Sequence, residues 1–449
     1  MSNLPNLELT HSLALYQRAL ARIPGGAQTN SKRPSQFALG GYPIYAERGE
    51  GGTIVDVDGN RYIDLVQALG PVILGYCHPT VDAAIAAQLQ RGILYGLMSP
   101  LEVTCAELLG EVIPCAEMVR FFKGGGEATA AAARTVRAYT GRDLILNSGY
   151  RGWPDVWAAA AGDAGIPAAM SESVETFPEF DLATLHDRFA FHQGQVAAVF
   201  LDIQRAAPPP GYLAAVKALC HAQGTLLVFD EIVTGFRLAL GGMQELYTVT
   251  PDLACFAKAM ANGMPLACVA GRADVMSTMQ NRLISITYGG ESLSLAAAVA
   301  CIATLRAEQV PATLWQLGAR LRAGLNQAAS NAGIPFLCAG LDPMTTMSFT
   351  DAPVADSSST TFQADPGRER AVDAGQALLW EYFLQEMAVR GVLLRRGGLN
   401  FLTSSHTAEQ IDHVVDAAGD VFGELRNLWD VDALRQAVQA RKHRLFHAQ

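Results

Sequence analysis

The sequence predicts an α/β protein with three layers and a mostly parallel central sheet. Short apolar runs typical of buried strands alternate with longer helical patterns, and this alternation builds a parallel sheet covered by helices. The clearest apolar run is Thr225–Phe229, which is followed directly by Asp230. Another run, Val119–Phe122, is followed closely by a triple glycine and an alanine-rich segment, the order expected for a strand, a turn and a helix start.

Two residues of the stretch 225–270 stand out chemically. Asp230 closes a strand, and in open α/β sheets the ligand crevice lies beyond the carboxyl ends of the strands. Lys258 is the only charged residue between Leu253 and Ala270. Burial lowers the pKa of a lysine and makes its amine a nucleophile that can form a Schiff base. For either residue alone, a loop cap or a lysine reaching solvent along its aliphatic stem is the commoner explanation.

Length and charge restrict the class of protein. The chain has 449 residues, half of them hydrophobic, which is enough for a large core and indicates two domains. Its formal net charge of −10 argues against nucleic acid or an anionic membrane as a partner. The longest apolar helix-like run, Ser292–Leu305, has 14 residues, too few to span a bilayer.

The cysteines and the N-terminus indicate a cytoplasmic protein without a metal site. The eight cysteines are scattered, and the sequence contains neither a Cys-x-x-Cys nor a His-Glu-x-x-His motif. We therefore expect reduced thiols rather than a disulfide scaffold or a zinc site. The start of the chain lacks the basic and apolar segments of a signal peptide.

Taken in order, the N-terminal region predicts a helix, a loop and a hairpin. Residues 13–23 form an amphipathic pattern that stops at a Pro-Gly-Gly sequence. The basic loop that follows contains Arg33, and its composition alone favours a solvated loop. Two short strand-like segments then flank Asp58-Gly59, within residues 53–64, which is a hairpin signal.

The triple glycine Gly124, Gly125 and Gly126 predicts a turn before a helix. Such a turn exposes backbone N–H groups at the positive end of the helix dipole, which is a ready phosphate site. Taken alone, three glycines before a helix more often mark only a tight turn. Similarly, Tyr150 lies among glycines, where an aromatic residue usually serves loop packing.

The C-terminal third predicts a helix over residues 313–333, an apolar strand ending near Arg395 and Arg396, and a final helix capped at Ser405-His406-Thr407. Two adjacent arginines can bind a carboxylate bidentately. An exposed strand end is the commoner explanation of such a pair.

These stretches, taken together and in order, resemble one family. The resemblance rests on the segment from Asp230 to Arg237, on Lys258 followed by Pro265, and on residues 23–26, 53–64, 70–79, 149–155 and 287–290. The chain is similar to pyridoxal 5′-phosphate (PLP) enzymes of fold type I, as a class III aminotransferase of the glutamate-1-semialdehyde aminomutase branch. The resemblance implies a large cofactor-binding domain over residues 67–310 and a small α+β domain formed by residues 1–66 and 311–449.

The resemblance also implies the roles of individual residues. Lys258 would form the Schiff base with the cofactor, and Asp230 would pair with its pyridine nitrogen, which keeps the ring able to accept electrons. Tyr150 and Ile232 would pack on opposite faces of the ring. Thr287 would reach the cofactor phosphate of a neighbouring subunit, which implies a homodimer with shared active sites. The remaining expected cofactor contacts are Gly124, Gly125, Gly126 and Val233.

Several positions depart from the branch pattern, and most of them surround the expected substrate. Glycines replace both hydroxyl residues of the phosphate turn, at Gly124 and Gly126. Arg151 replaces a histidine, Asp202-Ile203 replaces Glu-Pro, and Val233 stands where many relatives have glutamine or methionine. The residues that we expect to bind substrate carboxylates are Arg33, Arg151, Arg395 and Arg396.

The function expected from the resemblance is amino transfer between small molecules. An amino donor such as glutamate would load the cofactor, which then aminates a keto acceptor, while Lys258 acts as general acid and base. An alternative is an aminomutase, which moves the amino group within one molecule. A third possibility, a catalytically silent dimer of the same fold, is disfavoured by the presence of both Asp230 and Lys258.

Overall fold

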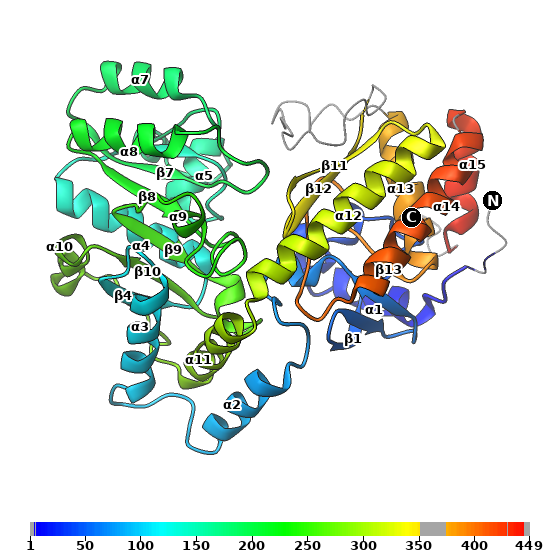
Figure 1. Cartoon of the computed structure of the whole chain (residues 1–449), viewed down its shortest axis with the longest axis horizontal. Coiled ribbons are helices and arrows are strands. Elements are labelled where there is room, and N and C mark those ends of the chain that lie inside the picture. Colours follow the sequence, from blue (N-terminus) through cyan, green and yellow to red (C-terminus); the bar gives the residue numbers. More distant parts are fainter. Residues whose placement is uncertain (1–3, 5, 351–373, 429, 444–449) are drawn as a thin grey trace. The chain divides into compact units, whose positions relative to one another are not determined.

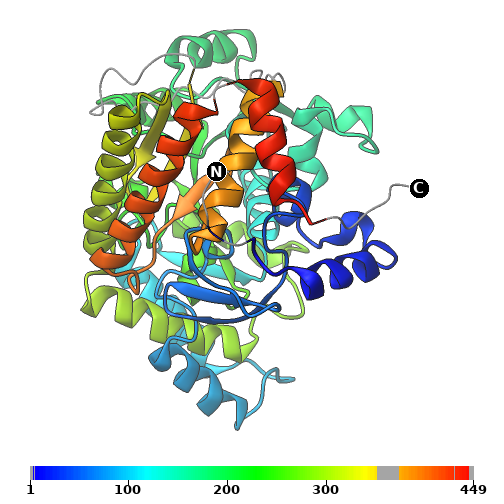
Figure 2. The same ribbon diagram turned by 90° about the vertical axis from the view of Figure 1, so that its right-hand side faces the viewer.

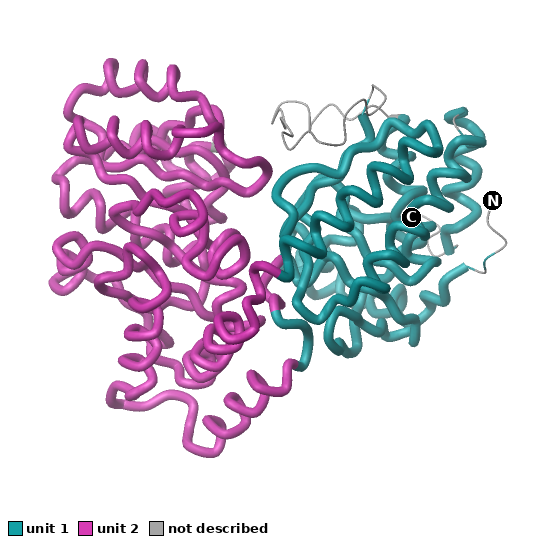
Figure 3. Tube along the Cα trace, viewed as in Figure 1, with its two compact units in different colours: residues 1–69, 74–77, 313–449 teal, residues 70–73, 78–312 magenta. Residues whose placement is uncertain are grey.

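The computed structural model describes residues 4, 6–350, 374–428 and 430–443. The chain divides into two compact units, which Figure 3 colours separately. Unit 1 comprises residues 1–69, 74–77 and 313–449, and unit 2 comprises residues 70–73 and 78–312. The domain boundaries predicted from the sequence lie after residues 66 and 310. The grouping of residues 74–77 with unit 1 was not predicted.

Unit 2 is built on a seven-stranded sheet in the order β4-β10-β9-β8-β7-β5-β6. Figure 1 labels β4, β10, β9, β8 and β7 of this sheet. Strand β10 runs antiparallel to both of its neighbours, β9 and β4. All other pairings in this sheet are parallel, which confirms the mostly parallel sheet predicted from the sequence. The strands are β4 (Met118–Phe122), β5 (Leu144–Ser148), β6 (Val174–Thr176), β7 (Val196–Leu201), β8 (Leu226–Asp230), β9 (Leu253–Phe256) and β10 (Ala267–Gly271).

Helices cover both faces of this sheet. Helix α4 (Gly125–Thr140) connects β4 to β5 and packs on β9 and β10, while α8 (Tyr212–Ala222) connects β7 to β8 and packs on β8. The two connections cross the sheet in opposite directions. Because such crossovers are right-handed, α4 and α8 lie on opposite faces and complete the three layers. The other helices of unit 2 are α2 (Pro79–Leu89), α3 (Pro100–Val112), α5 (Asp155–Ala158), α6 (Ala168–Ser171), α7 (Leu182–Phe191), α9 (Met243–Leu246), α10 (Ala273–Met276) and α11 (Ser292–Ala307).

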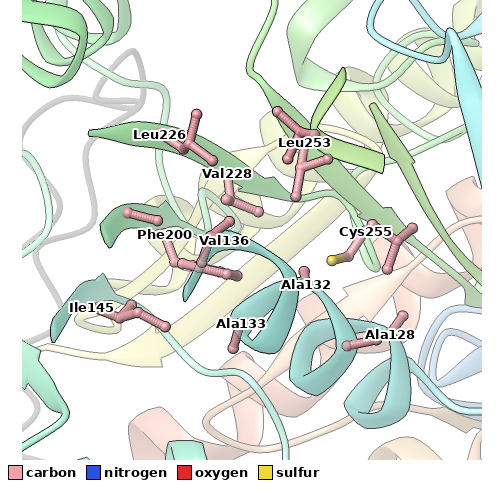
Figure 4. Packing of buried hydrophobic residues seen from close by; sticks show 14 of the residues in the cluster. Ala128, Ala132, Ala133, Val136, Ile145, Phe200, Leu226, Val228, Leu253 and Cys255 are labelled. Atoms are coloured by element: carbon pink, nitrogen blue, oxygen red, sulfur yellow. The ribbon is translucent and has the colours of Figure 1, made fainter. Parts of the chain in front are cut away.

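The main core of unit 2 lies between α4 and the sheet (Figure 4). Alanines on the buried face of α4, among them Ala128 and Ala132, allow the helix to approach the strands closely. Phe200 and Val228 fill the space beneath them and are fully buried. Burial of each such side chain contributes about 1.5–3 kcal/mol. This packing fixes α4, and therefore its N-terminus, relative to the carboxyl ends of the strands.

Unit 1 contains two smaller sheets, in the orders β1-β2-β3-β13 and β11-β12-β14. Figure 2 shows two of its helices, α13 in orange and α15 in red, side by side, and they pack on each other. Most of α12 also belongs to this unit. The elements are α1 (Thr10–Leu20), β1 (Ala46–Glu50), β2 (Thr53–Asp56), β3 (Arg61–Asp64), α12 (Val310–Ala332), β11 (Phe336–Leu341), β12 (Met344–Phe349), α13 (Ala374–Val389), β13 (Val392–Leu393), β14 (Leu399–Phe401), α14 (Ala408–Asn427) and α15 (Val431–Arg441).

The local predictions for unit 1 hold in part. The hairpin around Asp58-Gly59 is confirmed as β2 and β3, which pair antiparallel. Helix α1 begins at Thr10, three residues before the predicted start. The reason is a distant cap, since the Asp58 carboxylate accepts hydrogen bonds from the N–H groups of His11 and Ser12 at 2.6 and 2.9 Å.

At the other end of the chain, the cap of α14 is confirmed. The Thr407 hydroxyl accepts a hydrogen bond from Gln410 N, and the Gln410 side chain accepts one from Thr407 N. This helix is not the last one, because Asp430 caps a further helix, α15. Across the described ranges, no single helix is long and apolar enough to cross a membrane; α11 and α12 pass that test only as a pair bent by 68°.

Candidate active site

A cavity of about 350 Å³ lies in unit 2 at the carboxyl edge of its sheet. Its walls come mainly from the segments that follow β4, β5, β7, β8 and β9, so the parallel strands deliver their next residues to one place. The lining residues are Pro71, Lys123, Gly125, Gly126, Tyr150, Arg151, Gly152, Gln204, Asp230, Ile232, Val233, Ala257, Lys258, Gly263, Met264, Pro265 and Leu266.

Asp230 is the last residue of β8 and supplies a buried carboxylate to this cavity. Only 4% of the residue is exposed. Its Oδ1 atom accepts a hydrogen bond from the N–H group of Ile232 at 3.0 Å, which fixes the orientation of the carboxylate. Burial raises the pKa of Asp230, and the charges of Arg151 and Lys258 oppose this rise. An ionised Asp230 therefore depends on these neighbouring cations.

Lys258 reaches the cavity from the next strand. Strand β9 ends at Phe256, and Lys258 follows two residues later, at the start of a short 3-10 helix, η6 (Lys258–Ala261). Its backbone is left-handed, with a φ of 48°, which for a residue with a side chain costs on the order of 1–3 kcal/mol. The residue is half-buried among apolar neighbours. Strain of this kind is common where a side chain must be aimed at a functional site.

Ile232 and Val233 form an apolar wall beside Asp230. Ile232 lies against the first turn of α4, where a Cβ atom on Gly125 would come within 2.7 Å of the Ile232 Cδ1 atom. A side chain at position 125 would therefore force the end of the Ile232 side chain to shift. A Cβ atom on Gly124 would be tolerated, since its nearest neighbour would be a carboxylate oxygen of Glu127 at 3.7 Å, an ordinary van der Waals distance.

The start of α4 offers backbone donors to the cavity. The Glu127 carboxylate accepts hydrogen bonds from Lys123 N at 3.0 Å and from Gly124 N at 2.8 Å. The next N–H groups, of Gly125 and Gly126, belong to the first turn, which has no intrahelical acceptors. These donors and the helix dipole favour an anion at this end of the cavity.

Lys123 is a further residue of the site and was not predicted from the sequence. Lys123 lines the cavity, and its Nζ atom lies 2.8 Å from Oε2 of Glu291. Glu291 in turn caps α11 by accepting hydrogen bonds from the N–H groups of Leu293 and Ser294. The signal in the sequence was a cation placed directly between a strand and a glycine turn.

Arg151, expected from the sequence to bind substrate, lines the cavity and contacts two protein carboxylates. Its side chain is fully buried, and its Nη1 atom is 3.3 Å from Oδ2 of Asp202 and 3.5 Å from Oδ2 of Asp230. The guanidinium also donates to the backbone oxygens of Ser148 and Tyr150, at 2.5 and 3.0 Å. This cation therefore faces two protein carboxylates at the edge of the cavity, and its expected contact with substrate stays a prediction.

Tyr150 lines the cavity but is 75% exposed, so its ring is not held by packing within the chain. Thr287 is exposed, in the segment before α11, and does not line the cavity of its own chain. Arg33, Arg395 and Arg396 belong to unit 1. The roles expected for these five residues stay predictions.

The residues of the cavity fit PLP. Asp230 offers a buried carboxylate for a pyridine nitrogen, and Lys258 offers an amine for an aldehyde. Ile232 offers an apolar surface for a flat ring, and the first turn of α4 offers N–H groups for a phosphate. When bound, PLP supplies an electron-accepting ring that stabilises negative charge at a substrate carbon.

Comparisons with known proteins agree with this geometry. The family model for class-III aminotransferases matches residues 38–337. A protein of Myxococcus xanthus (strain DK1622) named glutamate-1-semialdehyde 2,1-aminomutase is 38% identical over 378 residues, which cover 80% of this chain and 87% of that protein.

Solved structures give the same result. The FumI protein of Sphingopyxis sp. MTA144, in its PLP internal aldimine form, superposes with a TM-score of 0.84 at 26% identity and covers 93% of this chain and 96% of its own. An omega-transaminase from Sphaerobacter thermophilus gives a TM-score of 0.81 at 27% identity, with coverage of 92% of this chain and 98% of its own. The chain belongs to the class-III aminotransferases and is an enzyme that depends on pyridoxal 5′-phosphate.

Proposed function

We propose that the enzyme transfers an amino group from an amino-acid donor, glutamate, to a separate keto acceptor that carries a carboxylate. The observation that carries this proposal is the convergence of Asp230 and Lys258 on one cavity, beside the N-terminus of α4. A carboxylate, an amine and an anion site that line one cavity meet the needs of a PLP-dependent transfer.

Each of the two central residues has a definite task. The Nζ atom of Lys258 acts as a general base and then as a general acid. It takes the proton from the Cα atom of the donor and delivers it to the cofactor carbon that takes up the amino group. Asp230 holds a proton on the pyridine nitrogen through its charge. Its burial makes this interaction strong, because the surrounding dielectric is low.

We also propose a homodimer in which Thr287 of the partner subunit completes the phosphate site. Two features support it. Thr287 is exposed and so is available to a second chain. In addition, unit 2 carries large apolar side chains that are more than 80% exposed, namely Leu97, Met98, Trp153 and Leu283. Exposed apolar groups of this size are typical of surfaces that pack against another protein.

The alternative is intramolecular transfer, as in an aminomutase. It is favoured by the relative from Myxococcus xanthus, whose name is glutamate-1-semialdehyde 2,1-aminomutase. Intermolecular transfer is favoured by the omega-transaminase of similar fold and by the departure at Val233, which lines the cavity. A change of residues around an otherwise retained Asp230 and Lys258 indicates a change of substrate rather than a loss of chemistry.

The test is to add glutamate alone to the cofactor-loaded enzyme and record the visible spectrum. A transaminase shifts its cofactor to the amine form, releases one 2-oxoglutarate per site and stops until a keto acid is added. The Lys258→Ala variant is the control and should not respond. An unchanged spectrum with glutamate, together with turnover of glutamate-1-semialdehyde without a second substrate, would establish the aminomutase instead. A protein that shows no visible cofactor band after incubation with PLP would be the silent scaffold.

A further inference from the structure

Arg151 is a buried cation shared by two carboxylates from different strands. Asp202 directly follows β7, Asp230 ends β8, and the Nη1 atom of Arg151 lies 3.3 and 3.5 Å from their Oδ2 atoms. All three side chains are buried. A buried charge is tolerated only when it is paired and hydrogen-bonded, so each member of this cluster depends on the other two.

The backbone around the cluster is shaped for this contact. The carbonyl groups of Ser148 and Tyr150 hold the guanidinium. Gly149 has a φ of +99°, and a Cβ atom there would come within 2.7 Å of the Asp202 Cβ atom. Glycine at position 149 therefore lets the short Asp202 side chain come close to the long Arg151 side chain.

The charges of the cluster explain its use. Arg151 with two ionised carboxylates carries a net charge of −1, which a protonated pyridine nitrogen beside Asp230 brings to zero. Arg151 alone with Asp230 would already be neutral, and a protonated pyridine nitrogen would then leave an unbalanced positive charge in a buried place. Asp202 therefore supplies the second negative charge that allows Arg151 and a protonated pyridine nitrogen to share Asp230.

We propose that Arg151 and Asp202 form a matched pair of positioning residues that keeps Asp230 ionised and aimed at the cofactor. Arg151 holds the Asp230 carboxylate in place through its positive charge. Asp202 balances that charge with its own negative charge. Neither residue has to touch substrate for this task. The inference rests on the proposed pairing of Asp230 with the pyridine nitrogen.

A dependence on pH follows. Burial raises the pKa of Asp202 to about 7, the repulsion from Asp230 adds to this, and Arg151 opposes it. The other groups that act on the pair are Glu179, whose charge repels that of Asp202, Gln204, which donates a hydrogen bond to Asp202, and Lys258 and Cys255 beside Asp230. A positive pyridine ring favours ionised Asp202, so binding of PLP should release a proton near neutral pH and strengthen as the pH rises through about 7.

The first test is a double-mutant cycle on the dissociation constant of PLP from the apoenzyme, measured by fluorescence. Arg151→His shortens the cation, and Asp202→Glu lengthens the acid. We expect each single change to weaken PLP binding about tenfold or more, and the double variant to recover most of this loss. Losses that simply multiply in the double variant would overturn the pairing. Circular dichroism confirms that each variant is folded.

The second test uses Asp202→Asn, which keeps the shape of the side chain and removes its charge. The ratio of its PLP dissociation constant to that of the wild type should be close to one at low pH and should rise to a plateau above pH 7. Asp187→Asn, on α7, is the matched control, since Asp187 is an exposed acid that is not among the groups acting on Asp202, and it should leave the pH profile unchanged. A ratio that does not vary with pH overturns the proposal. Asp230→Asn distinguishes a failure of this inference from a failure of the proposed function. If Asp230→Asn weakens PLP binding while the Arg151 and Asp202 variants do not, the proposed function stands and this inference fails.

Discussion

Asp230 and Lys258 leave the same edge of the sheet from two neighbouring parallel strands. Asp230 of β8 pairs with Cys255 of β9, and Lys258 follows Cys255 by three residues. The left-handed backbone of Lys258 then turns its side chain from the strand direction toward the cavity. The distance between acid and amine is thus set by strand register, which is among the most rigid relationships in a parallel sheet.

The first prediction concerns Lys258. Lys258→Ala should abolish turnover but still retain PLP, because Asp230 and the start of α4 remain in place. Equilibrium dialysis with PLP measures the retention. In the wild type, borohydride reduction should attach the cofactor to a peptide that contains Lys258. A label on Lys123, the other lysine that lines the cavity, would contradict the assignment.

The central pair could be predicted from the sequence because its signals are local. An apolar run that ends in an acid, and a single lysine within an apolar segment, are both visible without a structure. The parallel sheet follows from the same alternation of patterns. The position of α1 could not be predicted, because its cap is the carboxylate of Asp58, which lies far along the chain.

The two protein carboxylates that surround Arg151 could not be predicted from the sequence, for a physical reason. From the sequence, an arginine in a glycine-rich loop near a cofactor is most simply read as a ligand for substrate. The two carboxylates that bind it come from β8 and from the segment after β7, and only the order of strands in the sheet brings them together. Lys123 was missed similarly, since its partner Glu291 is 168 residues away.

The second prediction concerns the proposed dimer. Thr287→Ala should weaken PLP binding by about tenfold to a hundredfold, since a hydrogen bond to a charged group contributes about 1.5–3 kcal/mol. The dissociation constant of PLP measures this. Ser285→Ala, a neighbouring exposed hydroxyl, is the control and should have no effect. Full activity of a monomer at high dilution would argue against the shared site.

The third prediction concerns Lys123. Removal of its charge by Lys123→Met should weaken the binding of PLP more than that of pyridoxal, which has no phosphate, because the cation lies beside the anion site at the start of α4. Loss of one charged contact should cost about tenfold or more. Competition by inorganic phosphate should weaken in parallel. Equal losses for PLP and pyridoxal would instead indicate that the pair of Lys123 with Glu291 serves only to hold the fold.

The last prediction is a gain of affinity at the glycine turn. A Cβ atom on Gly124 would meet only Glu127, at an ordinary van der Waals distance, and the φ of −112° suits any residue. Gly124→Ser should therefore be tolerated, stabilise the start of α4 as an N-cap by a few tenths of a kcal/mol, and offer a hydroxyl to the phosphate.

We expect Gly124→Ser to bind PLP severalfold more tightly, with no change for pyridoxal, because one neutral hydrogen bond contributes about 0.5–1.5 kcal/mol. Gly125→Ala is the comparison variant, for which we expect the opposite effect, because its Cβ atom would overlap the Ile232 side chain. It should bind both ligands more weakly and lose about 1–3 kcal/mol of stability. Dissociation constants for PLP and pyridoxal, measured on both variants with their melting temperatures, test the pair. Weaker PLP binding by a well-folded Gly124→Ser variant would show that the phosphate does not lie at this turn.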